Sequence, residues 1–301
     1  MNKIFDNIQG DKTLWAVLIL LAGFSFLPVY SAASNLAYVG GGGNTFNFLF
    51  KHFIHLSLGF TFMYFMQKIP YHYFRGISIL MMPVVIVLLT YTLLQPSLAD
   101  SLTNTNRWIK IPFVGFTFQP STFAGLILMI YVSRYLAKIK DKEISFGKTI
   151  LPLWIPILTI LLLILPANFS TTAILFSMVI LLCFTGGYPV KYLTGIIISG
   201  ILVLTIFILT VKAYPGIFPN RVDTWKSRIE NFINQENTTE NYQIEKAKIA
   251  IATGGVKGLG PGKSVQKNFL PQSSSDFIFA IIIEEYGLIG GLSILLAYSL
   301  F

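Results

Sequence analysis

The sequence has little charge, since only 12% of its 301 residues are Asp, Glu, Lys or Arg, whereas soluble domains carry about 25%. Hydrophobic residues make up 54%, more than a soluble protein of this size can bury. This composition excludes a soluble enzyme, a nucleic-acid-binding domain and a disordered protein. The apolar runs are long rather than alternating, which disfavours an outer-membrane β-barrel. We therefore expect a chain that is solvated by lipid.

Potential metal ligands are also scarce. Cys183 is the only cysteine, so the chain can form neither an internal disulfide nor a cysteine-based metal cluster. His52 and His55 are three residues apart, but the only other histidine, His72, is expected on the opposite side of the membrane. We therefore predict no metal site. The sequence does not determine whether a cofactor such as a divalent cation takes part.

Eight apolar runs approach the length of about 20 residues that a helix needs to cross a bilayer. We therefore predict an all-α fold, a polytopic transmembrane helical bundle that forms a single integral-membrane domain over residues 1–301. The predicted spans are 14–34, 46–66, 76–95, 121–137, 150–166, 170–187, 190–213 and 277–301. A tight turn at 166–169 is expected between the fifth and sixth spans. The last run reaches the chain end without a polar flank, so we expect a shortened form of a longer protein.

Positive charge indicates the orientation, because lysine and arginine concentrate in the cytoplasmic loops of membrane proteins. With the N-terminus inside, the inner segments hold Lys3, Lys12, Lys68, Arg75, Arg134, Lys138, Lys140, Lys142, Lys148 and Lys191. The short outer loops hold only Arg107 and Lys110, with Lys51 at an outer helix end. The N-terminus is thus predicted to be cytoplasmic, and the net charge of +9 fits this bias and anionic headgroups.

Residues 214–276 form the one large hydrophilic segment and are predicted to be an extracytoplasmic loop. Short helices are expected near 221–233 and 242–252, followed by an irregular glycine-rich stretch at 254–262. That stretch continues into Gly-Lys-Ser at 262–264, but its glycine spacing does not fit a P-loop. Together with Lys257, Lys263 and Lys267, the stretch either binds a lipid pyrophosphate through N–H groups and charge or is simply a flexible basic loop.

Three acidic residues lie at or within a predicted span, namely Asp276, Glu284 and Glu285. Asp276 is either a helix N-cap or a catalytic base at the outer membrane surface. The two glutamates lie roughly 12 Å deeper at the helical rise per residue. Because charge is costly in a bilayer, we expect both to face the bundle interior or a water-filled cavity.

Several motifs resemble those of the SEDS family of shape, elongation, division and sporulation proteins. They are Tyr-Ser-Ala-Ala-Ser at 30–34, Asn-Arg-Trp-Ile at 106–109, Phe-Gln-Pro-Ser at 118–121, Gly-Lys-Ser-Val-Gln-Lys at 262–267, and the stretch from Phe-Leu-Pro at 269–271 to Glu-Glu-Tyr-Gly at 284–287. The Gly-Lys-Ser-Val-Gln-Lys motif resembles the division branch more than the elongation branch. The family has ten spans, so the resemblance implies that the last two are missing here.

The resemblance implies a peptidoglycan glycosyltransferase that polymerises lipid II, a disaccharide-pentapeptide on undecaprenyl pyrophosphate, during septal cell-wall synthesis. It implies Asp276 as the catalytic base, and the substrate-binding residues Arg107, Trp108, Gln119, Lys257, Lys263, Lys267 and Glu284. The implied location is the bacterial inner membrane at the division septum. The implied partners are lipid II, membrane lipids, a class B penicillin-binding transpeptidase and other division proteins, with no nucleic acid.

The chain departs from the family at Thr122, Gly125 and Asn168, where Glu, Lys and Asp are frequent, which predicts a less charged central cavity. Two other functions remain open, a flippase or transporter for lipid-linked precursors and a non-catalytic division scaffold. A transporter needs polar residues along its whole path, and the spans carry almost no charge midway apart from the two glutamates, which favours the enzyme.

Overall fold

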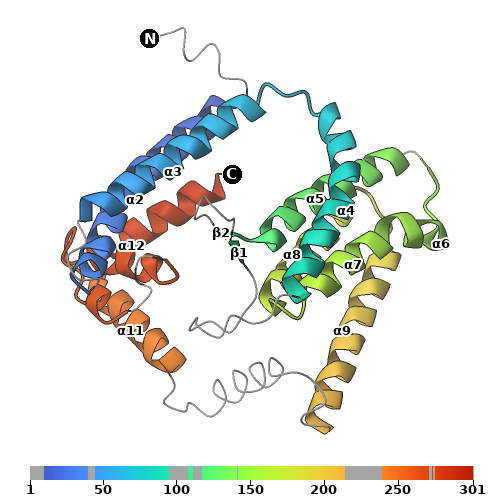
Figure 1. The fold of residues 1–301 in the computed structure, drawn as a ribbon. Coiled ribbons are helices and arrows are strands. Elements are labelled where there is room, and N and C mark those ends of the chain that lie inside the picture. Colours follow the sequence, from blue (N-terminus) through green and yellow to red (C-terminus); the bar gives the residue numbers. More distant parts are fainter. Residues whose placement is uncertain are drawn as a thin grey trace. The chain divides into compact units, whose positions relative to one another are not determined.

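The computed structural model describes residues 10–39, 45–94, 108–110, 117–140, 142–213, 239–270, 273 and 275–300, and these are almost entirely helical (Figure 1). The helices are α2 (Lys12–Val39), α3 (Thr45–Met66), α4 (His72–Leu94), α5 (Pro120–Ile139), α6 (Phe146–Thr149), the π-helical turn η1 (Ile150–Trp154), α7 (Ile155–Ile164), α8 (Phe169–Thr185), α9 (Val190–Ala213), α11 (Thr239–Gly254), the 3₁₀ turn η2 (Gln266–Asn268) and α12 (Ile278–Ser299). The strands β1 (Ile109–Lys110) and β2 (Thr117–Phe118) form a short antiparallel ladder. The predicted helical class is confirmed.

Five helices in the described part of the chain are long and apolar enough to cross a membrane. They are Lys12–Ala32, His72–Leu94, Pro120–Ile139, Phe146–Ile164 and Ile278–Ser299. The sixth and seventh predicted spans coincide with the shorter apolar helices Phe169–Thr185 and Val190–Ile206, and the second coincides with α3. Five of the eight predicted spans therefore qualify as candidate membrane spans by length and composition.

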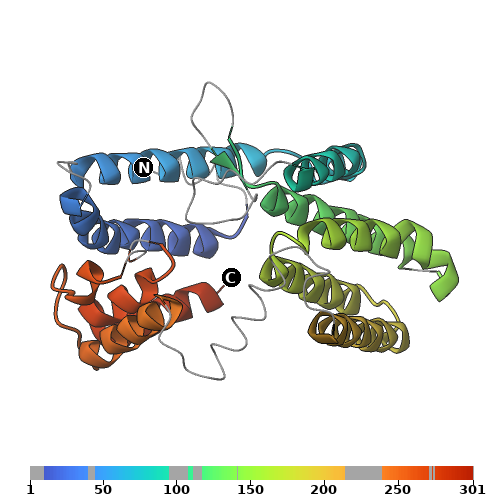
Figure 2. The same ribbon diagram turned by 60° about the horizontal axis from the view of Figure 1, so that its bottom comes forward.

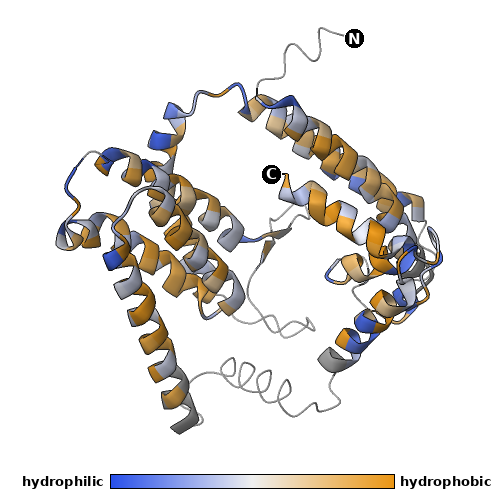
Figure 3. Cartoon of the chain, turned by 180° about the vertical axis from the view of Figure 1, so that it is seen from behind, coloured by the Kyte–Doolittle hydropathy of each residue, from blue (hydrophilic) through white to orange (hydrophobic). Residues whose placement is uncertain are grey.

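Most helices are built largely of hydrophobic residues (Figure 3), and many of these side chains are exposed. Leu20 is 69% exposed on α2, Leu80 is 69% exposed on α4, and Leu151 is 74% exposed on η1. Such surfaces are stable in lipid, because a helix satisfies its backbone polar groups internally and offers only side chains to the acyl chains.

The chain divides into two compact units, the first made of residues 1–69 and 226–301. In this unit α2 and α3 lie side by side (Figure 2). The last helix, α12, packs against both α2 and α11. The N-terminal helix pair and the C-terminal part of the chain, which are far apart in sequence, therefore build one structure.

Residues 70–225 form the second unit. Here α5 packs against α4 and α8, while α7 contacts α4 and α8. The expected tight turn is confirmed, since α7 ends at Ile164 and α8 begins at Phe169. Asn168 caps α8, because its side-chain oxygen accepts a hydrogen bond from the Thr171 N–H at 3.2 Å. Its replacement of the frequent family Asp thus retains a residue suited to capping.

Candidate active site

Helix α12 is interrupted at Gly287, whose φ of 69° and ψ of −172° are not helical. The break prevents the carbonyl groups of Glu284 and Glu285 from bonding to the next turn of their own helix. Instead, they accept hydrogen bonds from the N–H groups of Leu259 and Gly260, both at 2.9 Å. The glycine-rich stretch thus satisfies the carbonyl groups that the break releases.

The N–H groups beyond the break are satisfied by the same stretch. Leu288 donates to the Gly255 carbonyl at 2.9 Å, and Ile289 donates to the Val256 carbonyl at 3.4 Å. Residues 255–260 therefore form four hydrogen bonds to α12 in place of the intrahelical bonds lost at the break. Irregular backbone at membrane depth is tolerated only when it is satisfied in this way. The stretch has the irregular turns that we predicted, but it is docked into α12 and is not the flexible loop of one interpretation.

Glycine permits this docking because the two backbones touch directly. A Cβ atom on Gly258 would lie 2.3 Å from the Glu285 carbonyl oxygen, and one on Gly254 would lie 2.1 Å from that of Ile283. Gly258 also has a φ of +79°, which L-residues with a side chain rarely adopt. Close approach explains the glycine at both positions, and positive φ is a second reason at Gly258.

The Glu284 side chain is fully buried, with 0% exposure. One carboxylate oxygen accepts hydrogen bonds from the backbone N–H of Val265 at 3.0 Å and of Gln266 at 3.3 Å. The other oxygen accepts from the Ser264 hydroxyl and again from the Gln266 N–H at 3.3 Å. Glu284 therefore receives the free N–H groups where η2 begins, a position that favours negative charge.

The Glu285 side chain is 1% exposed. Its Oε1 accepts hydrogen bonds from the Ser264 backbone N–H at 3.3 Å and from the hydroxyl of Ser31 on α2. The Lys267 ammonium group donates to the Ser31 hydroxyl at 3.2 Å and to the Gly262 carbonyl at 2.8 Å. The Ser31 hydroxyl thus connects the Lys267 ammonium group to the buried Glu285 carboxylate.

We call this group of five side chains the carboxylate junction. It consists of Ser31, Ser264, Lys267, Glu284 and Glu285. Its hydrogen bonds offset part of the cost of burying two neighbouring acids, which is high for an unpaired carboxylate. The Oε2 atom of Glu285 is buried and has no hydrogen-bond partner among the described residues. The expectation that both glutamates face the protein interior is confirmed. The structure also gives Glu284 and Lys267 internal partners, in addition to the substrate contacts that the resemblance implies.

Asp276 lies just before α12 and is exposed. The alternative that it caps this helix is wrong, because the N-cap position belongs to Phe277 and has no side-chain cap. Its carboxylate has no partner among the described residues. The side chain is therefore available to a ligand at the start of the helix.

Lys257 and Lys263 are exposed on the glycine-rich stretch, while Lys267 is half-buried in the carboxylate junction. Lys263 is held in a turn, because its backbone N–H donates to the Gly260 carbonyl at 3.2 Å. The first unit thus combines Asp276 with two exposed cations on a segment that is anchored to α12.

The other predicted site residues belong to the second unit. Arg107 lies outside the described residues. Trp108 is 52% exposed beside β1, and Gln119 is half-buried at the start of α5. The Thr122 hydroxyl lies 3.4 Å from the Gln119 side-chain oxygen, so the position where the family often has Glu keeps a polar contact.

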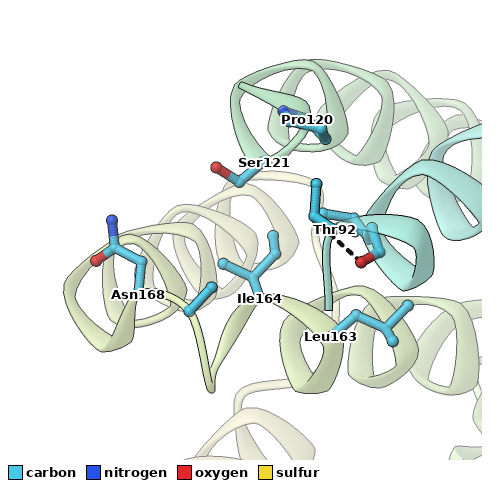
Figure 4. A pocket seen from close by; sticks show the side chains of 8 residues that line it. Thr92, Pro120, Ser121, Leu163, Ile164 and Asn168 are labelled. Atoms are coloured by element: carbon cyan, nitrogen blue, oxygen red, sulfur yellow. Dashed lines mark hydrogen bonds between the residues drawn. The ribbon is translucent and has the colours of Figure 1, made fainter. Parts of the chain in front are cut away.

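A small pocket opens beside Pro120 and Ser121, at the start of α5 (Figure 4). It is lined by Leu89, Thr92, Pro120, Ser121, Leu163, Ile164, Ala167 and Asn168. The Thr92 hydroxyl bonds to its own helix, donating to the Leu89 carbonyl at 2.7 Å. The lining contains no charged side chain.

The sequence did not identify Ser31 and Ser264 as site residues. Ser31 is 254 residues from Glu285, so only the fold brings them together. A signal for Ser264 was present, since this serine follows the glycine-rich stretch and lies between Lys263 and Lys267. The stretch was expected to be irregular, however, so its contacts were not predictable.

Residues 11–301 match the model of the cell cycle protein family that includes FtsW, RodA and SpoVE. The chain belongs to this family. This confirms the resemblance to the SEDS proteins. Together with the five candidate spans, membership makes the chain a multi-pass protein of the inner membrane.

Relatives share sequence over almost the whole chain. The probable peptidoglycan glycosyltransferase FtsW of Marinomonas mediterranea is 31% identical, and the alignment covers 100% of this chain and 73% of the relative. A protein of the same name from Geobacter sulfurreducens is 30% identical, covering 93% and 72%. A third, from Wigglesworthia glossinidia brevipalpis, is 29% identical, covering 98% and 74%. The similarity to FtsW agrees with the predicted division branch.

A solved structure has the same fold. That chain comes from a peptidoglycan synthase complex that coordinates polymerization and crosslinking. The TM-score is 0.67, and the match covers 97% of this chain and 76% of that chain at 16% identity. At this identity, the likeness shows the fold.

Proposed function

We propose that this protein is a peptidoglycan glycosyltransferase that polymerises lipid II into glycan strands at the outer face of the cytoplasmic membrane, during septal cell-wall synthesis. The family match over residues 11–301 carries this proposal, because it includes every predicted site residue of both units. The names of the relatives support the same activity.

Glycosyl transfer requires a base for a weakly nucleophilic hydroxyl group. The hydroxyl oxygen of one lipid-linked sugar attacks the anomeric carbon of another, and the bond from that carbon to pyrophosphate breaks. A positioned carboxylate accelerates this step by accepting the hydroxyl proton as the new bond forms. We assign this role to Asp276, which is exposed and has no partner among the described residues.

The departing pyrophosphate develops negative charge, which fixed cations and N–H dipoles stabilise. Lys257 and Lys263 are exposed on the stretch docked into α12 and supply such charge. Arg107, Trp108 and Gln119 remain proposed substrate contacts, and an arginine suits bidentate phosphate binding. Because Lys267 and Glu284 bond to the protein itself, we propose that they act by holding the segment in place.

The proposed topology places this chemistry outside the cytoplasm. Eight spans with a cytoplasmic N-terminus put residues 214–276 on the outer side, as the lysine and arginine distribution favours. Asp276 then lies where the eighth span begins, at the outer membrane surface. The sugars of a lipid-anchored substrate are located at this level.

The proposed partners follow from the activity. Glycan strands must be crosslinked, so a class B penicillin-binding transpeptidase is the expected membrane partner, with further division proteins at the septum. The fold likeness to a chain from a peptidoglycan synthase complex is compatible with such an assembly.

The test is incubation of the purified full-length protein with lipid II, with and without the transpeptidase. We expect glycan strands and released undecaprenyl pyrophosphate. A parallel assay measures lipid II translocation in vesicles. Translocation without polymerisation would contradict the proposal in favour of a transporter, and transpeptidase binding with neither activity would contradict it in favour of a scaffold.

A further inference from the structure

The carboxylate junction joins three segments of the first unit. Ser31 belongs to α2, Lys267 to the turn η2, and Glu285 to α12. The Ser31 hydroxyl donates to Glu285 and accepts from the Lys267 ammonium group at 3.2 Å. Because Lys267 is 236 residues from Ser31 in sequence, this contact fixes the loop against a distant helix.

The direction of these hydrogen bonds follows from the chemistry of the groups. An ammonium group only donates and a carboxylate only accepts, so the hydroxyl between them must accept from Lys267 and donate to Glu285. The Ser31 hydroxyl therefore bridges the Lys267 ammonium group and the Glu285 carboxylate. Ser31 is 2% exposed and Glu285 is 1% exposed, so the hydrogen bond between them is shielded from bulk water.

Backbone hydrogen bonds also anchor described residues between η2 and Asp276. After η2, the Leu270 N–H donates to the Gln266 carbonyl at 3.1 Å, and the Ser273 N–H donates to the Leu270 carbonyl at 3.1 Å. Leu270 and Ser273 are both 2% exposed. Asp276 therefore lies between two anchored points, since η2 holds the segment before it and α12 holds the helix after it.

We propose that Ser31 and Lys267 are positioning residues for glycosyl transfer, which hold the segment carrying Asp276 in its reactive position without touching the substrate. This inference rests on the proposed function. It assigns a role to Ser31. It also makes Lys267 a residue that supports the site, and not one that binds the pyrophosphate.

The experiment measures kcat and KM for lipid II polymerisation by Ser31→Ala and Lys267→Met. Matched controls are Ser293→Ala, whose exposed hydroxyl bonds only to its own helix, and Lys248→Met, which changes an exposed lysine of α11. We expect kcat to fall about 10-fold to 100-fold in both junction variants, because small displacements of reacting groups are that costly. KM should stay within about twofold of the wild-type value. A KM change at constant kcat reports lost substrate contacts, and neither residue is proposed to touch the substrate. Both controls should retain wild-type values.

Two further variants separate positioning from a general loss of folding. The double variant Ser31→Ala/Lys267→Met should be no slower than the slower single variant, because residues that act as one unit are not additive. Lys267→Arg keeps the cation and its donors and should retain most of the kcat. If Ser31→Ala does not yield folded protein, the comparison of Lys267→Arg with Lys267→Met carries the test.

A raised KM at unchanged kcat in Lys267→Met, with normal Ser31→Ala, would overturn the inference and place Lys267 on the substrate. Wild-type kcat in both junction variants would also overturn it. Absence of polymerisation by the wild-type protein would instead overturn the proposed function, and this inference with it, so the two failures are distinguishable.

Discussion

Substitution of Gly258 by alanine tests whether the glycine-rich stretch is docked into the interrupted helix. The new Cβ would lie 2.3 Å from the Glu285 carbonyl oxygen and 2.5 Å from the Gly287 nitrogen. Both are backbone atoms, so neither can rotate away as a side chain would. The stretch must therefore withdraw from α12.

The expected cost has two parts. Alanine at a φ of +79° costs at least about 1 kcal/mol. Withdrawal also breaks the hydrogen bonds from Leu259 and Gly260 to α12, and each buried group left without a partner costs about 1–3 kcal/mol. We therefore expect Gly258→Ala to lower the free energy of unfolding by at least about 3 kcal/mol.

Gly255→Ala is the matched control, because Gly255 has a φ of +53° but no atom within 4 Å of an added Cβ. It should cost only the backbone strain, about 1 kcal/mol. The assay is denaturant titration of both variants and the wild-type protein in the same detergent. Equal destabilisation by the two alanines would refute the docking, because strain alone would then explain the cost of Gly258→Ala.

Two further predictions concern the junction and the topology. Glu284→Ala removes the acceptor for Ser264, Val265 and Gln266 and should lower the free energy of unfolding by at least about 2 kcal/mol, whereas Glu284→Gln keeps one carbonyl oxygen and should cost less. Equal effects in denaturant titration would show that the side-chain acceptor does not hold the loop. A reporter fused after Lys140 should be cytoplasmic and one inserted near Asn237 external, because lysine and arginine mark the inner side. A cytoplasmic reporter near Asn237 would invalidate the outer position of Asp276.

Most helices were predictable because their signal is local. An apolar run of sufficient length specifies a helix without knowledge of its neighbours, and α7 and α8 meet at the expected turn at 166–169. The helix expected at 242–252 is likewise present as α11, Thr239–Gly254. The helix expected at 221–233 lies outside the described residues.

The interruption of α12 was not predictable, because it depends on a partner from elsewhere in the chain. The apolar run at 277–301 resembles one continuous span, and Gly287 alone does not break a helix. The break is stable because residues 255–260 supply the missing hydrogen bonds. The two glutamates showed from sequence that something polar must lie inside the bundle, but not that Ser31 would be among their partners.

The alternative that Asp276 caps the helix rested on a local sequence pattern. Three serines at 273–275 before an aspartate at the start of an apolar run are typical of a helix N-cap. The helix begins later, at Ile278, so the cap position moves to Phe277. The Asp276 carboxylate therefore does not cap the helix and is exposed.

The rate of lipid II polymerisation by Asp276→Asn, relative to the wild-type protein, tests the central claim most directly. Asparagine has nearly the same shape but lacks a basic carboxylate, and the exposed side chain makes no contact among the described residues whose loss would unfold the protein. The account predicts a loss of about 10²–10⁴-fold in rate, as for removal of a general base, with an unchanged unfolding transition in detergent. Near-normal polymerisation by Asp276→Asn would contradict it.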